Sequence, residues 1–217
     1  MAYLVQVMER LRAPGGCPWD AQQDHRSLVQ YLLEEAYEAA EAIEAGSRED
    51  LREELGDVLL QVVFHASIAA GEPDPFDLDD VAQQVADKLV SRHPWVFCEA
   101  EGADGEGGGI TAEQSYARWD RIKEQEKQRQ SVLEGIPVAQ SALARAQKVV
   151  GRARRGEVPV ELPDGAGLGP RLLALVAEAD GAGLDAEAEL RAAVRLLEQQ
   201  IRDLEQAGRE AVAGERN

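Results

Sequence analysis

The chain is poor in cysteine and aromatic residues, and it contains no long hydrophobic run. Its 217 residues include two cysteines, Cys17 and Cys98, which predicts free thiols in a reducing cytoplasm rather than a disulfide framework. No segment approaches the roughly 18 consecutive apolar residues that a membrane-spanning helix needs. Residues 1–12 are too short and too charged for a signal peptide. We therefore expect a cytoplasmic protein without a membrane partner.

Positive charge is also scarce in this chain. The 23 lysines and arginines are outnumbered by 41 aspartates and glutamates, which gives a net charge of −18. A surface this negative repels phosphate backbones and anionic lipids, which argues against a nucleic-acid partner. A free nucleotide stays compatible with such a surface where a metal ion and local cations offset the field.

Helix-forming residues, in contrast, are abundant. Ala, Leu, Glu, Gln and Arg dominate, aromatic residues make up 5%, and the 44% of hydrophobic residues suffice for a core. We therefore predict an all-α fold. The spacing of apolar residues predicts helices over 2–12, 27–46, 47–70, 77–92, 111–130, 138–154, 170–180 and 185–207.

Local signals define the two central helices, 27–46 and 47–70. Ser27 and Ser47 are the predicted N-caps, and Asp50 completes a capping box with Ser47. The second helix is apolar nearly all round over 55–68, which predicts a buried helix. Loops are predicted at 17–20 and 99–110. The buried stripe of the first helix is expected at Leu28, Leu32, Ala36, Ala39 and Ile43.

Each of these two helices carries a pair of acids three residues apart, Glu35 with Glu38 and Glu54 with Asp57. Residues at this spacing share one narrow sector of a helix. Four carboxylates on facing helices would repel one another and resist burial unless a cation neutralised them. Oxygen ligands of this kind suit Mg²⁺ or Mn²⁺, which often bind substrate phosphates as well. The pattern therefore indicates metal-assisted phosphate chemistry.

Two alternative roles for these acids stay open at this point. In so acidic a chain, the acids could be part of a solvated helix face, as we expect for Glu34, Glu41 and Glu44. A ferritin-like di-iron bundle also places carboxylates inward, but that site requires Glu-x-x-His on two helices. Here both i+3 positions are acidic, which disfavours redox iron. His65 is interpreted as a histidine at the edge of the core.

The acidic residues lie in blocks that resemble the MazG family of nucleoside triphosphate pyrophosphohydrolases. The stretch Glu34-Glu35-Ala36-Tyr37-Glu38 followed by Glu54-Leu55-Gly56-Asp57 matches the family pattern EExxE…ExxD. The resemblance covers about residues 4–130. Further matching blocks are Leu11 with 16–20, the run 56–64, Asp87-Lys88-Leu89 with 92–97, and Ala117-Arg118-Trp119 with Ile122-Lys123.

The resemblance implies hydrolysis of a nucleoside triphosphate to the monophosphate and pyrophosphate, for cleaning of the nucleotide pool. It also implies Mg²⁺, with Mn²⁺ as a possible substitute, and a homodimer whose paired helices form a four-helix core. Glu34 or Glu38 would help to deprotonate the attacking water. The implied metal ligands are Glu35, Glu38, Glu54 and Asp57, and the implied substrate-binding residues are Tyr31, Lys88, Arg92, Trp119 and Lys123.

Simpler roles for several of these residues stay open. Lys88 and Arg92 could be solvated charges, and Trp119 could anchor a dimer interface. Trp19, Trp95 and Phe97 are interpreted as packing residues.

The second half of the chain is expected to be a degenerate second module. We assign 1–130 to the nucleotide pyrophosphohydrolase module, 131–138 to a linker, 139–207 to the degenerate module and 208–217 to a frayed tail. If Gly169-Pro170 opens the equivalent of the first acidic helix, the ligand positions fall on Glu178, Gly181, Ala192 and Arg195, so no metal site is expected there. Because one module has lost its acids, a regulatory nucleotide-binding module with little turnover, or a purely structural protein, are the alternatives to an active hydrolase.

Overall fold

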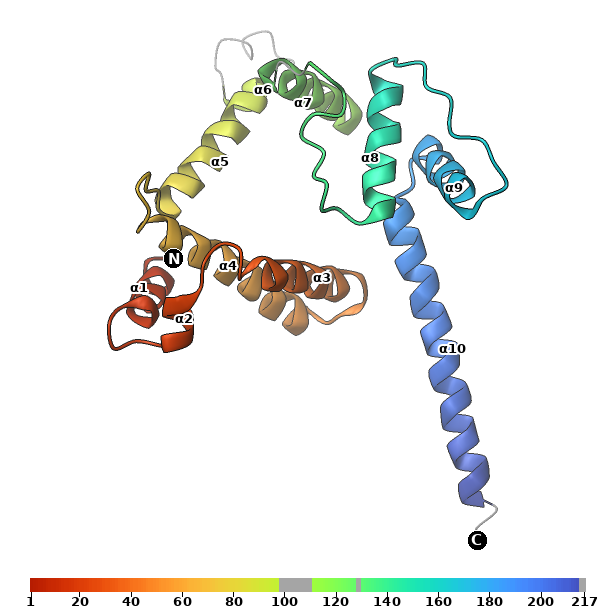
Figure 1. The fold of residues 1–217 in the computed structure, drawn as a ribbon, viewed down its shortest axis with the longest axis horizontal. Coiled ribbons are helices and arrows are strands. Elements are labelled where there is room, and N and C mark those ends of the chain that lie inside the picture. Colours follow the sequence, from red (N-terminus) through yellow and green to blue (C-terminus); the bar gives the residue numbers. More distant parts are fainter. Residues whose placement is uncertain (98–110, 128–129, 215–217) are drawn as a thin grey trace. The chain divides into compact units, whose positions relative to one another are not determined.

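The computed structural model describes residues 1–97, 111–127 and 130–214 (Figure 1). These residues form ten helices and no strand, which confirms the predicted all-α class. The chain divides into two compact units, Met1–Lys123 and Glu124–Asn217. Cys98 and the predicted loop 99–110 lie outside the described residues, whereas Cys17 is a free thiol. No described helix is long and apolar enough to cross a membrane.

The first unit is built around two helices, α3 (Val29–Ala45) and α4 (Arg48–Ala69), which pack side by side (Figure 1). Gly46 joins them where a side chain would not fit, because a Cβ there would lie 2.7 Å from Ala42 Cα. Ser47 then starts α4 with the predicted capping box, in which Ser47 and Asp50 each bond the other's backbone N–H. The other elements of this unit are α1 (Ala2–Arg12), α2 (Pro18–Gln22), α5 (Leu78–Arg92), α6 (Pro94–Phe97) and most of α7 (Ala112–Lys127).

The core of the first unit lies where α1 crosses the carboxyl-terminal half of α4. Met8 from α1 and Leu28, which precedes α3, are 1% exposed and pack with residues of α4. The members from α4 are Val63, Phe64 and Ile68.

The burial of α4 differs along its length, and the prediction of a helix buried throughout 55–68 is wrong. Val63 and Phe64 are buried, but Leu55 is 52% exposed. The reason is that α1 covers the second half of the helix, while the first half packs on α3.

The predicted stripe of α3 is also partly wrong. Its buried positions are Ala39 and Ala42, whereas Leu32 and Ile43 face solvent. Alanine side chains are small, so α3 and α4 can approach closely where Ala39 and Ala42 are buried. The larger apolar side chains lie on the outer face and stay uncovered within this chain.

Two short helices and one cap were not predicted correctly. Residues 17–20 were expected to be a loop, but Pro18 opens the short helix α2, and Pro94 opens α6. Ser27 is not the N-cap of α3, which begins after Leu28 without a side-chain cap. Ser27 instead belongs to the preceding turn, where its backbone N–H donates to Asp24 Oδ1 over 2.7 Å.

The second unit contains three main helices, α8 (Ala142–Arg155), α9 (Leu168–Ala182) and α10 (Ala186–Gly214). Gln147 connects them, because its Nε2 donates to the Leu184 carbonyl over 2.6 Å and its Oε1 accepts from Ala186 N–H over 2.8 Å. Helix α10 continues to Gly214, which places 208–214 of the predicted frayed tail within the helix.

Candidate metal centre

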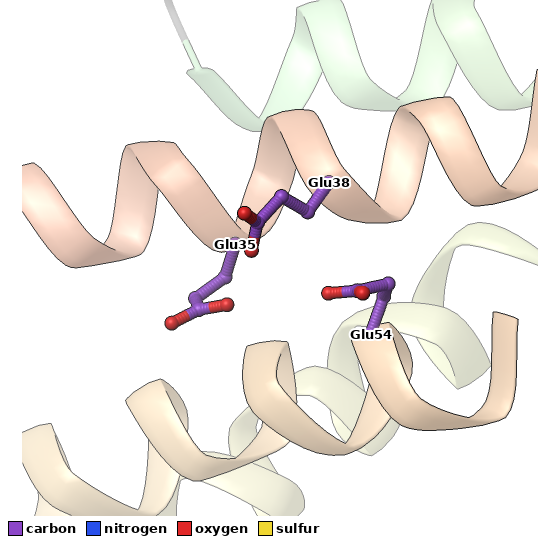
Figure 2. Close-up of side chains that lie close together, drawn as sticks. All are labelled: Glu35, Glu38 and Glu54. Atoms are coloured by element: carbon purple, nitrogen blue, oxygen red, sulfur yellow. The ribbon is translucent and has the colours of Figure 1, made fainter. Parts of the chain in front are cut away.

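Three of the predicted metal ligands meet between α3 and α4. Glu35 and Glu38 extend from one helix and Glu54 from the other, toward the space between them (Figure 2). One carboxylate oxygen from each lies within 4.8 Å of those of the other two. Spacing of three residues places the first two on one sector of α3, and the hairpin turn brings α4 alongside. This group, Glu35, Glu38 and Glu54, is the acidic triad below.

The acidic triad carries negative charge that is not offset by an ion pair within the part of the chain that the structure describes. Among the ion pairs of the described residues, none joins a lysine or arginine to a triad carboxylate. Burial raises the pKa of Glu35 above its usual 4.5, and the charges of Asp57 and Glu38 raise it further. Burial also raises the pKa of Glu54, with the charges of Glu38 and Asp57 as the next causes. The site therefore favours a proton or a bound cation over free carboxylates.

Asp57, the fourth predicted ligand, is half-buried and lies beside the triad rather than within it. Its charge reaches both Glu35 and Glu54, as the raised pKa of each shows. Glu34, a predicted catalytic residue, is exposed on α3 and adds to the rise in the pKa of Glu35.

A pocket of about 400 Å³ opens beside the triad at the hairpin end of the two helices. Glu38 and Glu54 line it together with Glu41 and Asp50, which were not predicted as site residues. Glu41 was expected on a solvated helix face; it is exposed, but it lies on the side of α3 that lines this pocket. The signal was present in the sequence, because Glu35, Glu38 and Glu41 continue one spacing of three residues.

Tyr31, a predicted substrate-binding residue, lies one turn before Glu35. Its ring packs edge-on against Trp19 with centroids 5.7 Å apart, and Trp19 in turn packs edge-on against Phe64 at 6.4 Å. The ring of Tyr31 therefore contacts the edge of the core.

Three further predicted substrate-binding residues gather where α5 ends and α7 passes. The Arg92 guanidinium lies 5.7 Å and the Lys123 ammonium 4.5 Å from the centre of the Trp119 ring. Arg92 is 9% exposed, so it is not the solvated charge that was the alternative. Lys88, one turn earlier on α5, is exposed. A separate pocket of about 320 Å³ opens here, lined by His93, Ser115, Tyr116 and Trp119.

These two pockets share no lining residue. One is acidic and belongs to the α3–α4 hairpin, and the other combines aromatic rings with adjacent cations. The acidic pocket and the aromatic pocket are therefore distinct surfaces of the described residues.

The donors of the acidic triad fit a hard divalent cation. All are carboxylate oxygens, and no histidine or cysteine among the described residues joins the group, which suits Mg²⁺ or Mn²⁺ more than zinc or copper. His65, the nearest candidate for a nitrogen ligand on α4, bonds instead to His25, with their Nδ1 atoms 2.7 Å apart.

Comparison with known proteins agrees with this geometry. Residues 23–97, which include the triad, match the sequence model of the MazG nucleotide pyrophosphohydrolase domain. Proteins named nucleoside triphosphate pyrophosphohydrolase from Mycolicibacterium smegmatis and Mycobacterium tuberculosis are 41% and 43% identical over 94% and 88% of this chain. The chain belongs to the MazG family. A protein from Streptomyces cacaoi described as an uncharacterized 26.1 kDa protein is 48% identical, over 93% of this chain and 81% of its own length.

This MazG-family chain is shorter than its named relatives. It spans 58% of the M. smegmatis protein and 53% of the M. tuberculosis protein. A solved mazG-related protein from Thermotoga maritima is 30% identical, with 57% of this chain covering 99% of that chain at a TM-score of 0.45. The matched domain ends at residue 97, before Trp119 and Lys123.

Proposed function

We propose that this chain hydrolyses nucleoside triphosphates to the monophosphate and pyrophosphate with Mg²⁺, as a house-cleaning enzyme of the cytoplasmic nucleotide pool. One observation carries the proposal: three carboxylates from α3 and α4 converge within 4.8 Å, and no lysine or arginine of the described residues forms an ion pair with them. The names of the mycobacterial relatives support the same reaction. Mn²⁺ is expected to substitute, because it accepts the same oxygen ligands.

The triad residues and Asp57 would hold the metal, which when bound supplies charge neutralisation for a triphosphate and acidifies a water. Glu38 is the exposed member of the triad and can face both the pocket and the metal. We assign it, or the adjacent Glu34, to accept the proton of the attacking water. The raised pKa of Glu35 fits a ligand whose charge is balanced only when a cation is present.

The second pocket is the proposed place for the rest of the nucleotide. Trp119 offers a ring face, and Arg92 and Lys123 lie close enough to it to meet phosphate oxygens at its edge. Lys88, exposed on the same helix as Arg92, is assigned to the phosphates as well. Tyr31 is assigned to the substrate from its place one turn before Glu35.

A homodimer with a four-helix core is part of the proposal. The outer face of α3 leaves large apolar residues exposed, among them Leu33, Tyr37 and Ile43, and Leu55 is exposed on α4. Four uncovered apolar side chains on one helix hairpin support burial against a second copy of the hairpin.

The decisive experiment is a screen of nucleoside triphosphates in which products are resolved by chromatography. We expect equal amounts of monophosphate and pyrophosphate, dependent on Mg²⁺ and abolished by a chelator. Release of orthophosphate and a diphosphate would contradict the proposed bond cleavage.

A regulatory nucleotide-binding module is the second candidate. It is favoured by the second unit, where the ligand positions of the module fall on Glu178, Gly181, Ala192 and Arg195, so that one of four acids is kept. Calorimetric binding of a nucleotide with Mg²⁺, without any product, would support this candidate against the hydrolase.

A further inference from the structure

Helix α10 carries a stripe of apolar residues that the second unit leaves uncovered. Leu190, Val194, Leu197, Ile201 and Leu204 are each between 43% and 74% exposed. Their spacing alternates between four and three residues, so they form one continuous line along the helix. We call these five residues the α10 stripe.

The contacts of α10 within its unit are made near its first residues. Ser141 Oγ donates to Glu187 Oε2 over 2.7 Å, and Gln147 bonds at Leu184 and Ala186. Beyond this point the helix extends past α8 and α9, as Figure 1 shows. A long helix with one apolar face gains most of its stability from burying that face, which predicts a partner for the stripe.

The residue types of the stripe specify what that partner is. In a heptad, Val194 and Ile201 occupy a positions, while Leu190, Leu197 and Leu204 occupy d positions. β-Branched residues at a with leucine at d favour a parallel pair of helices over larger bundles. Gly208 takes the next a position and offers no side chain, so the stripe ends there.

The charge along this segment permits two copies of a strongly anionic chain to meet. Between Leu190 and Arg209 the helix holds four arginines and three acids, although the whole chain has a net charge of −18. Glu198 and Glu205 flank the stripe, and each lies 4.0 Å from an arginine one turn later, Arg202 and Arg209. In a parallel pair these glutamates would face Ala193 and Gln200 of the other copy, so no like charges oppose each other.

We propose that α10 pairs with α10 of a second copy of this chain as a parallel, in-register, two-stranded coiled coil. The stripe forms its interface, and the pairing is separate from the proposed dimer of the α3–α4 hairpins. It gives the second unit a role in assembly that does not depend on any reaction at the acidic triad.

Disulfide trapping in the full-length chain tests the proposal. In a background with Cys17→Ser and Cys98→Ser, Leu190→Cys and Leu204→Cys are made as single variants. The two positions are about 21 Å apart along the helix, so only a parallel pair brings each next to its own copy. We expect both variants to form covalent dimers on mild oxidation. Gln199→Cys, on the opposite face, is the control and should stay monomeric on a non-reducing gel.

Crosslinking at neither position, at only one of the two, or equally at residue 199 would overturn the proposal. A second measurement reports on α10 alone, because the proposed hairpin dimer could hold two copies together by itself. In the Leu204→Cys variant, adding Leu197→Lys should lower the yield of covalent dimer several-fold, whereas adding Leu196→Lys, outside the stripe and 69% exposed, should not. Equal yields for these two variants would also overturn the proposal, provided circular dichroism shows both to be helical.

Discussion

The two units differ in whether their partly buried acidic side chains form ion pairs. In the first, Glu35, Glu38 and Glu54 converge with no ion pair to a lysine or arginine among the described residues. In the second, Asp180 of α9 has a side chain that is 11% exposed and lies 3.0 Å from the Arg154 guanidinium of α8. A Cβ at Gly151 would come within 2.8 Å of Asp180 Oδ1, so the glycine makes room for this acid.

This difference distinguishes an acid that stabilises the fold, Asp180, from the acids of the triad, to which we assign a function. Asp180 is neutralised inside the chain, and its pairing holds two helices together. The acidic triad is left without such a partner, which costs the fold stability unless an external cation binds. This unpaired charge is the reason why we propose the metal site at the triad rather than at Asp180.

The largest expected effect is the loss of activity on neutralising a triad residue. Glu54→Gln should lower kcat/KM for triphosphate hydrolysis by about 100-fold or more, because one charged metal ligand is removed. Steady-state kinetics at saturating Mg²⁺ measures this. Glu49→Gln, on the same helix but outside the triad, is the matched control and should keep activity. Full activity in Glu54→Gln would remove the triad from the mechanism.

The unpaired acids of the first unit should make its stability depend on pH and on Mg²⁺. Because the pKa values of Glu35 and Glu54 are raised, the metal-free fold binds their protons more tightly than the unfolded chain does. The stability that they contribute is present below pH 4.5 and is lost as pH rises through the raised values.

At neutral pH, Mg²⁺ at 100 times its Kd should then add about 2.7 kcal/mol to the free energy of unfolding. Thermal melts with and without Mg²⁺ measure the gain. Glu54→Gln should melt higher than wild type without metal and gain little from adding it. If the melting temperature of the wild type does not change when Mg²⁺ is added, that result would contradict a metal site.

In the second unit, removal of Arg154 should destabilise the fold, whereas neutralising Glu54 of the triad should stabilise the metal-free fold. Arg154→Met leaves Asp180 without its partner and should lower the free energy of unfolding by about 1 kcal/mol, since the guanidinium is half exposed. Urea denaturation measures the loss. Arg145→Met, on the same helix and exposed, should change stability by less. An equal loss in both variants would show that the ion pair contributes nothing specific.

The smallest effect concerns His65 of the first unit, whose pKa is lowered whereas the pKa values of the two acids are raised. Burial lowers the pKa of His65 below 6.5, and the charge of His25 lowers it further. The folded chain should therefore lose stability as pH falls below 6.5, because the unfolded chain takes up the proton first. Protonation of both rings would also remove the acceptor from their Nδ1 hydrogen bond.

His65→Gln should flatten the pH dependence of stability in this range by about 1 kcal/mol or less. Chemical denaturation at pH 5.5 and pH 7.5 measures it, with His93→Gln as the control outside this pair. A pH dependence that persists unchanged in His65→Gln would assign it to other groups.

Many of the helices could be predicted from the sequence, because their ends and apolar spacing depend on residues close together in the chain. The capping box at Ser47 and Asp50 and the spacing in 2–12 give helix ends that tertiary contacts do not alter. The short helices α2 and α6 were missed because a proline at the start of a short segment predicts a turn as readily as a first helical residue.

The faces of the central helices were harder to predict than the helices themselves. The predicted stripe of α3 included Ala39, which is buried, but also Leu32 and Ile43, which are exposed, and it missed Ala42. Close packing of two helices favours small side chains at the contact, and the sequence does not show which neighbour each helix packs against. For Glu41 the spacing of three residues was a usable signal, but its place beside the pocket also depends on how α3 is rotated against α4.

The sequence by itself determined the helical class, the family and the acids that carry the proposed chemistry, because composition and spacing act through the chain alone. The tertiary structure decided which carboxylates converge, since distances between helices depend on packing. It also separated the Trp119 pocket from the acidic one and left the α10 stripe uncovered. Periodicity marks a face as apolar, but only the fold decides whether the chain covers that face or leaves it for a partner.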